Sequence, residues 1–243
     1  MTYLIILAAA LLPVIALLCY IYKSDPISEP LPMLKKAFLY GVMICLPASL
    51  AEMFLSYGVF GIGDQPTSFL GAAVESFFVA ALAEESLKLT ALWLILRNNP
   101  YFDEHFDGIV YAVFVSLGFA AIENVMYLFS NSGDWLSVGI GRALLAVPGH
   151  YAFGVIMGYY YSMYCFVKRS SYNRMMILVA PIIAHGIYDT IAFSASLTAE
   201  LASALMFALC IFCYFLQKNA RRKLAEHVKR DTDPFHFWMN DER

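Results

Sequence analysis

The sequence contains few charged residues. Only 14% of its 243 residues are Asp, Glu, Lys or Arg, whereas 60% are hydrophobic. A soluble domain has roughly 25% charged residues, so this composition excludes an ordinary soluble protein. Apolar runs long enough to span a bilayer occupy most of the chain. We therefore expect an all-α fold, a polytopic transmembrane helix bundle that lies in the cell membrane as a multi-pass protein.

Cysteines are also few, and the common hydrolase signatures are absent. Cys210 and Cys213 form a CxxC pair, but no second pair accompanies it, so neither a zinc site nor a redox site is expected from the cysteines. The chain has no serine in a GxSxG context and no HExxH motif, which disfavours covalent and zincin chemistry. It also lacks an inverted repeat, which argues against a secondary transporter.

Seven apolar segments are predicted as membrane spans. They cover residues 2–22, 37–58, 69–96, 108–130, 139–166, 175–196 and 199–217. The first has no basic n-region and no convincing cleavage site, so we expect a retained helix rather than a signal peptide. We divide the chain into a transmembrane domain, residues 1–217, and a basic cytoplasmic tail, residues 218–243.

The basic residues predict how these spans are oriented. Fourteen of the sixteen lysines and arginines fall in alternate loops or in the tail, and the other two, Lys88 and Arg142, lie within spans. Positively charged loops stay on the cytoplasmic side of a membrane. We therefore predict that the N-terminus lies outside and the C-terminus in the cytoplasm.

Ionisable residues within the spans are the main functional signal. They are Glu75, Glu84, Glu85, Lys88, Glu123, Arg142, His150, His185 and Asp189. A charged residue at the centre of a membrane helix costs roughly 2.5–3.5 kcal/mol on insertion scales, so such residues face a bundle interior or a wet cavity. Carboxylates outnumber lysines and arginines in this set, and we expect at least one carboxyl group to keep or share a proton.

The depths of these residues nearly coincide. Glu84 and Glu85 lie at mid-membrane, and His150 and His185 lie near the same level in two later spans. Lys88 is about 5 Å deeper toward the cytoplasm. The polar residues slightly further out are Glu123, Asn124 and Asp189. Four helices thus bring polar groups to one level, which predicts a functional site rather than a network that only fixes helix packing.

Local spacing supports that prediction. His185 and Asp189 lie four residues apart and so share one helix face. Pro181 precedes His185 by one turn, and a proline there removes a backbone hydrogen bond and can open the helix to a cavity. Glu84 and Glu85 point about 100° apart, so one should face the reacting centre and the other a partner such as Lys88. A packing role is preferred for the residues nearer the outer ends, which are Glu52, Glu75 and Arg142.

Four motifs occur in a familiar order. They are "EESLK" at 84–88, "FDGIVYAVFVSLGFAAIENVMY" at 106–127, "PGHYAFG" at 148–154 and "HGIYD" at 185–189. With these motifs the chain resembles the PrsW-type intramembrane proteases, within the wider superfamily of CAAX-prenyl endopeptidase-like (Abi) membrane proteins. The resemblance implies a glutamate-dependent intramembrane endopeptidase that uses no cofactor. Residues 1–217 would be its protease domain.

The resemblance also implies roles for the paired glutamates. Glu84 would activate the water that attacks the scissile carbonyl, and Glu85 would support it. Where the CAAX-type members have FxxxH, this chain has Phe119 and then Glu123. That departure leaves the partner of Glu84 open, and His150 is the candidate to replace the missing histidine.

The resemblance further implies which residues would stabilise the oxyanion. The HxxxN of the CAAX-type members becomes His185 and Asp189 here. Asp189 can donate a hydrogen bond only when protonated, so His185 is the better candidate to stabilise the oxyanion. Lys88 and Asn124 are expected to be supporting residues.

The implied partners are a lipid bilayer and a single-pass membrane protein substrate of the anti-sigma factor class, cut near the outer face; no nucleic acid is expected. The sequence does not indicate the oligomeric state. A metal-dependent protease remains an alternative, with Glu84 or Glu85, Glu123, His150 and His185 as ligands. A proton- or ion-coupled transporter is another alternative, because transporters also place carboxylates and histidines at mid-depth.

Overall fold

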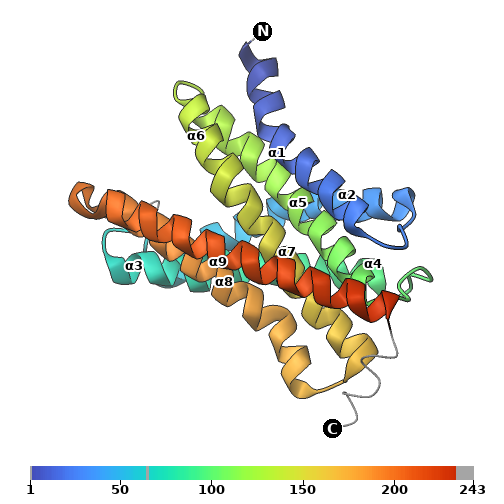
Figure 1. Ribbon diagram of the computed structural model, residues 1–243. Coiled ribbons are helices and arrows are strands. Elements are labelled where there is room, and N and C mark those ends of the chain that lie inside the picture. Colours follow the sequence, from blue (N-terminus) through green and yellow to red (C-terminus); the bar gives the residue numbers. More distant parts are fainter. Residues whose placement is uncertain (1, 64–65, 234–243) are drawn as a thin grey trace.

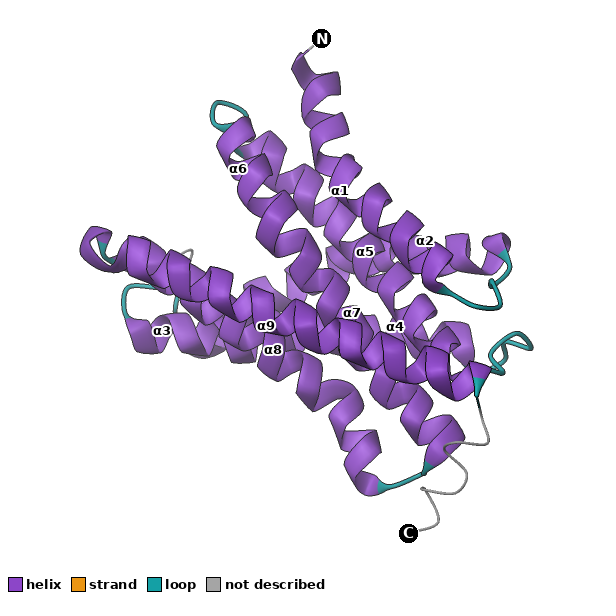
Figure 2. Cartoon of the chain, in the orientation of Figure 1, coloured by secondary structure: helices purple, strands orange, loops and turns teal. Residues whose placement is uncertain are grey.

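The computed structural model describes residues 2–63 and 66–233, and within these ranges every regular element is a helix (Figures 1 and 2). The N-terminal half contains α1 (Thr2–Ser24), α2 (Leu31–Met53), the π-helix η1 (Phe54–Phe60), α3 (Phe69–Val74), the π-helix η2 (Glu75–Ala81) and α4 (Leu82–Leu96). The C-terminal half contains α5 (His105–Ser130), α6 (Trp135–Gly141), the π-helix η3 (Arg142–Ala146), α7 (Val147–Ser162), the π-helix η4 (Met163–Val167), α8 (Ser171–Leu197) and α9 (Ala199–Thr232).

The prediction of a polytopic helix bundle is confirmed. Within the described residues, six helices are long and apolar enough to cross a membrane: 2–24, 31–60, 105–130, 135–167, 171–197 and 199–232. The remaining predicted span, residues 69–96, is helical throughout as α3, η2 and α4. It differs from the six in its charged residues, because the acidic pair Glu84 and Glu85, together with Lys88, lies within its apolar stretch. The chain is therefore a multi-pass membrane protein.

Two helix ends differ most from the predicted boundaries. α2 begins at Leu31 rather than at residue 37, because the lysines at its start do not interrupt helix formation. α9 continues to Thr232 without a break at residue 217, so the described part of the basic tail extends the last span. The division into a domain and a tail stays a prediction, and residues 234–243 lie outside the described residues.

α5 is the central helix of the bundle. In the apolar stretch of α5, 78% of the residues are buried, whereas the corresponding share is 22% in α1 and 17% in α9. Close approach depends on glycines: a Cβ atom at Gly158 of α7 would collide with the backbone of Gly108 of α5, and one at Gly41 of α2 with the carbonyl of Val115. Such small residues let membrane helices pack backbone to backbone. The contact between Gly158 and Gly108 holds α7 against α5, and these two helices carry His150 and Glu123.

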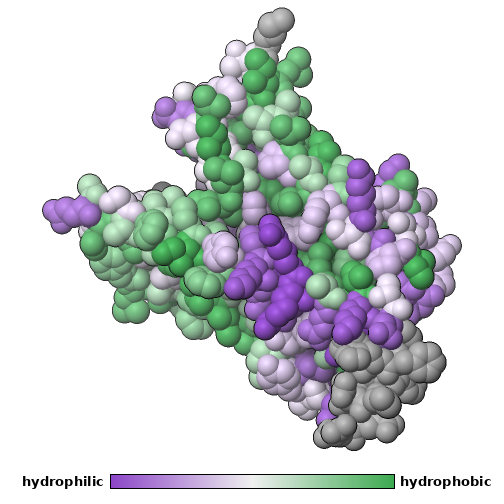
Figure 3. Space-filling view, in the orientation of Figure 1, coloured by the Kyte–Doolittle hydropathy of each residue, from purple (hydrophilic) through white to green (hydrophobic). Residues whose placement is uncertain are grey.

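The helices diverge from this core into two arms. One arm contains α1, α6 and the end of α5, and the other contains α3 and the α8–α9 hairpin (Figure 1). The surface is hollowed between the arms, and both arms are largely hydrophobic outside (Figure 3). Hydrophilic side chains gather instead over the C-terminal half of α9. The apolar arms suit contact with lipid.

Candidate active site

Glu84 and Glu85, the acidic pair of α4, both contact a lysine of the same helix. Lys88 Nζ donates to Glu84 Oε2 and to Glu85 Oε1, at 2.8 Å each. α4 follows directly on the π-helix η2, and π-helical turns are frequent at functional sites. The prediction that one glutamate would contact Lys88 was incomplete: because Lys88 lies three and four residues after the pair, its long side chain reaches both.

The two glutamates differ in access. Glu84 lines a cavity, whereas Glu85 does not and is fully buried. Oε2 of Glu85 has no hydrogen-bond partner among the described residues. Glu84 is therefore the member of the pair that a water or a substrate can reach.

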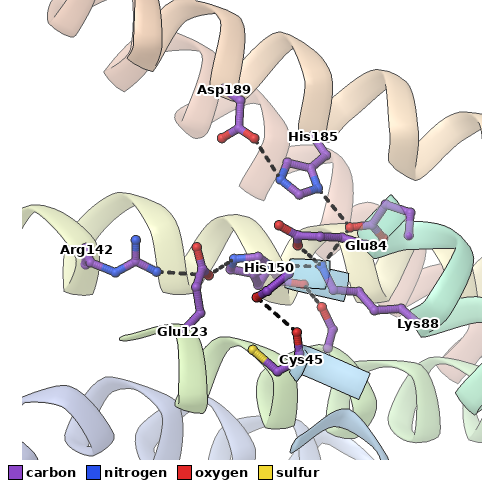
Figure 4. Close-up of polar contacts among 11 residues, drawn as sticks. Cys45, Glu84, Lys88, Glu123, Arg142, His150, His185 and Asp189 are labelled. Carbon is purple, nitrogen blue, oxygen red and sulfur yellow. Dashed lines mark hydrogen bonds and ion pairs between the residues drawn. The ribbon is translucent and has the colours of Figure 1, made fainter. Parts of the chain in front are cut away.

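His185 of α8 lies between two carboxylates. Its Nδ1 is 2.9 Å from Glu85 Oε1, and its Nε2 is 3.0 Å from Asp189 Oδ2 (Figure 4). A ring with a proton on each nitrogen satisfies both contacts, so this arrangement favours the imidazolium form. The ring of Phe153 stacks on His185 with centroids 4.7 Å apart, which fixes the ring plane.

His150 of α7 connects the lysine to a third carboxylate. Its Nδ1 lies 3.2 Å from Lys88 Nζ, and its Nε2 lies 2.7 Å from Glu123 Oε2 (Figure 4). An ammonium group only donates, so Nδ1 accepts and Nε2 carries the proton that it donates to Glu123. His150 is thus held as a neutral imidazole between α4 and α5.

Arg142 completes the network on the far side of Glu123. Its Nη2 lies 3.0 Å from Glu123 Oε2, and its Nε donates to Asn124 Oδ1 at 2.6 Å. Asn124 in turn donates to the carbonyl of Ala10, which ties α1 to the network. Asn124 therefore orients Arg142 and lies beside the cluster rather than in its centre.

A cavity of about 560 Å³ reaches this cluster between the two arms. Its polar lining includes Glu52, Glu75, Glu84, Glu123, Arg142, His150, His185 and Asp189. Pro66, Ser137 and Met206 line it as well, and they lie near loops that carry no lysine or arginine. The cavity thus joins the cluster to the end of the bundle opposite the basic loops.

Comparison with known proteins identifies the family. Residues 29–216 match the family described as PrsW family intramembrane metalloprotease. The chain belongs to the PrsW family of intramembrane proteases. It is 34% identical over 216 residues to a Protease PrsW of Oceanobacillus iheyensis, a match that covers 88% of this chain and 95% of the relative.

Two further relatives bear the same name. A Protease PrsW of Clostridioides difficile is 34% identical over 228 residues, covering 91% of this chain and 92% of the relative. A Protease PrsW of Bacillus subtilis is 37% identical over 194 residues, covering 79% and 84%. No solved structure matches the chain.

The description of the PrsW family implies a metal ion, and the residues present fit one. One ligand atom each from Glu84, Glu85 and His185 lies within 4.8 Å of the others, and Glu85 Oε2 is buried without a partner among the described residues. Nε2 of His185 faces Asp189, and Nε2 of His150 faces Glu123. In many metal sites a carboxylate orients a histidine ligand in this way. Glu123 and His150, two of the ligands expected in the metal alternative, are not part of this close group.

The structure brings the eight predicted site residues into one connected network of this PrsW-family chain, from α4, α5, α7 and α8. Their chemical roles stay predictions. Sequence reasoning placed Arg142, Glu52 and Glu75 outside the site, but all three line the cavity. An arginine within an apolar span is a signal that could have identified Arg142.

Proposed function

We propose that this chain is an intramembrane endopeptidase in which the carboxylate of Glu84 activates a water for attack on a peptide bond. The observation that carries the proposal is the position of Glu84. It is the member of the buried pair that borders the cavity. Lys88, which does not line the cavity, donates a hydrogen bond to its carboxylate. A general base needs this combination of access and orientation.

The proposed reaction uses the chain's own groups. Glu84 takes a proton from water while the water oxygen bonds to the scissile carbonyl carbon, and the carbonyl oxygen becomes an oxyanion. His185 lines the same cavity and is held by Glu85 and Asp189. Its positive charge would stabilise the oxyanion. Glu84 then returns the proton to the amine nitrogen as the C–N bond breaks.

The balance of acidic and basic groups in the site favours a carboxylate as the base. Glu84, Glu85, Glu123 and Asp189 face Lys88, Arg142 and the His185 imidazolium. Four acidic groups against three positive ones leave one proton to be shared, because burying an unpaired charge is expensive. A proton that moves among these groups is what a water-activating carboxylate requires.

Metal-dependent hydrolysis is the second candidate, because the ligand atoms of Glu84, Glu85 and His185 lie so close together. A bound divalent ion would supply Lewis-acid activation of water or carbonyl. We favour the metal-free mechanism because Lys88 Nζ contacts Glu84 Oε2, Glu85 Oε1 and His150 Nδ1 at once. It thereby supplies a cation from within the chain.

The proposed substrate is the span of a single-pass membrane protein in the cell membrane, and anti-sigma factors are the class that the resemblance suggests. The hollow between the two apolar arms supports lateral entry (Figure 3). The cavity extends toward the loops without basic residues, which by the positive-inside rule is the outer side. Water would therefore enter from outside and cleavage would occur near that face.

The test is cleavage of a candidate single-pass substrate by purified protein reconstituted in lipid. Wild type and Glu200→Gln, which changes an exposed carboxylate at the start of α9, should cleave alike. Glu84→Gln should leave a folded, extractable protein without cleavage. Full activity of Glu84→Gln would refute the assignment of the base.

A further inference from the structure

A second group of carboxylates lies at the other end of α5. Asp25 and Glu29 come from the loop between α1 and α2, Glu104 caps the start of α5, and Asp107 lies in its first turn. Sixteen residues of α5 separate Asp107 from Glu123, a distance of roughly 24 Å along the helix. The group is therefore distinct from the candidate active site.

Three of these carboxylates, Asp25, Glu29 and Asp107, are buried, and Glu104 is half-buried beside them. Asp107 is fully buried, and Asp25 and Glu29 are only 7% and 5% exposed. Among the described residues, no lysine or arginine forms an ion pair with any of the four. Buried charges in proteins are normally paired or coordinate a metal.

Hydrogen bonds fix the carboxylates but leave oxygens free. In a capping box, Asp107 Oδ2 accepts from the backbone N–H of Glu104 at 2.7 Å, and the Glu104 side chain accepts from the backbone of Asp107. Asp107 Oδ1 and Glu104 Oε2 have no partner among the described residues. Asp25 is held by the N–H groups of Ile27 and Glu29. The loops thus preorganise the side chains while two buried oxygens stay available.

Burial acts on the carboxyl groups of this cluster. Burial, together with the neighbouring acids, raises the pKa of Asp25 to about 6 and that of Glu104 to about 7. Burial also raises the pKa of Glu29, to which the hydroxyl of Tyr111 donates a hydrogen bond.

The geometry points to a cation. One oxygen each from Asp25, Glu104 and Asp107 lies within 4.8 Å of the others. An all-oxygen, carboxylate-rich set suits a hard divalent cation such as Ca²⁺ or Mg²⁺ and disfavours softer metals. We propose that Asp25, Glu104 and Asp107 bind one hard divalent cation, with Glu29 beside them. The ion would clamp the α1–α2 loop to the start of the central helix.

The proposal can be tested with Tb³⁺ as the probe on full-length protein in detergent. Tyr111 lies beside the cluster, so excitation of tyrosine should produce saturable Tb³⁺ luminescence. Ca²⁺ or Mg²⁺ should displace the Tb³⁺, and the same ions should raise the Tm. Asp107→Asn and Asp25→Asn keep the side-chain shape and should weaken Tb³⁺ binding at least tenfold.

Two controls keep the result specific. Glu84→Gln/Glu85→Gln should bind Tb³⁺ like wild type, which separates this site from the candidate active site, and Glu200→Gln should also be unchanged. Gel filtration establishes that each variant is folded, and Glu104→Gln replaces any variant that is not. Unchanged luminescence in all folded cluster variants, or loss only in the Glu84→Gln/Glu85→Gln protein, would overturn the proposal and leave a cluster neutralised by protons alone.

Discussion

Nζ of Lys88 on α4 lies 3.2 Å from Nδ1 of His150 on α7, although 62 residues separate them in the chain. This contact joins the acidic pair of one helix to the Glu123–Arg142 pair of two others. Lys88 is also 4.4 Å from the ring centroid of Phe119, which adds a cation–π contact. The lysine is thus the centre of the network.

Removing that lysine should destabilise the protein. Lys88→Met leaves the buried Glu84 without its cation and Glu85 with His185 alone, and breaking a buried ion pair in this way costs about 3–5 kcal/mol. The same substitution in a Glu84→Gln/Glu85→Gln background should cost much less, because no buried charge is left unpaired. Thermal unfolding in detergent measures both. Equal costs in the two backgrounds would show that Lys88 does not balance the pair.

Asp189 should act through His185. Asp189→Asn keeps the shape but removes the charge that holds His185 Nε2. We expect kcat to fall on the order of 100-fold with KM nearly unchanged, because the loss falls on the transition state. The pH profile of cleavage should shift as well, since the ring loses one of its two carboxylate partners. An unchanged pH profile would indicate a purely structural role.

The membrane orientation can be tested by labelling. In a cysteine-free background, single cysteines at positions 134 and 198 should react with an impermeant reagent added outside, because their loops carry no basic residues. Cysteines at positions 27 and 170 should be protected until the membrane is opened. Labelling of position 170 from outside would reverse the predicted topology.

The cut in the substrate should lie in the outer half of its span or just beyond it. Peptide bonds are shielded while helical, and a substrate helix unwinds most easily where water can take the freed hydrogen bonds. The cavity reaches the loops without basic residues, and the positive-inside rule predicts that these loops lie outside. Mass spectrometry of the fragments locates the cut. A cut in the cytoplasmic third of the span would refute this geometry.

The helices and the set of residues that meet in the site could be predicted well from the sequence, for a physical reason. Apolar length defines a span, and the scarcity of charge within spans makes each exception informative, so depth alone groups Glu84, His150 and His185. Depth does not give rotation about the helix axis. The contact of Lys88 with His150 and the cavity position of Arg142 therefore could not be derived.

π-helical turns are a second reason for the missing detail. η3 begins at Arg142 and leads into α7, and its wider turns change the direction in which Arg142 points relative to His150. An ideal helix of 3.6 residues per turn does not describe that segment. The second carboxylate cluster was missed as well, because its members come from a loop and a helix start, which only tertiary packing brings together.

In the proposed mechanism Glu84, and not a metal ion, activates the water. The direct measurement is substrate cleavage by protein stripped of metal with a chelator, with its metal content determined by mass spectrometry. We predict that metal-free wild type keeps its activity and that Glu84→Gln has none under either condition. Loss of activity on stripping, restored by adding Zn²⁺, would contradict this claim and favour metal-dependent hydrolysis, with Glu84, Glu85 and His185 as the candidate ligands.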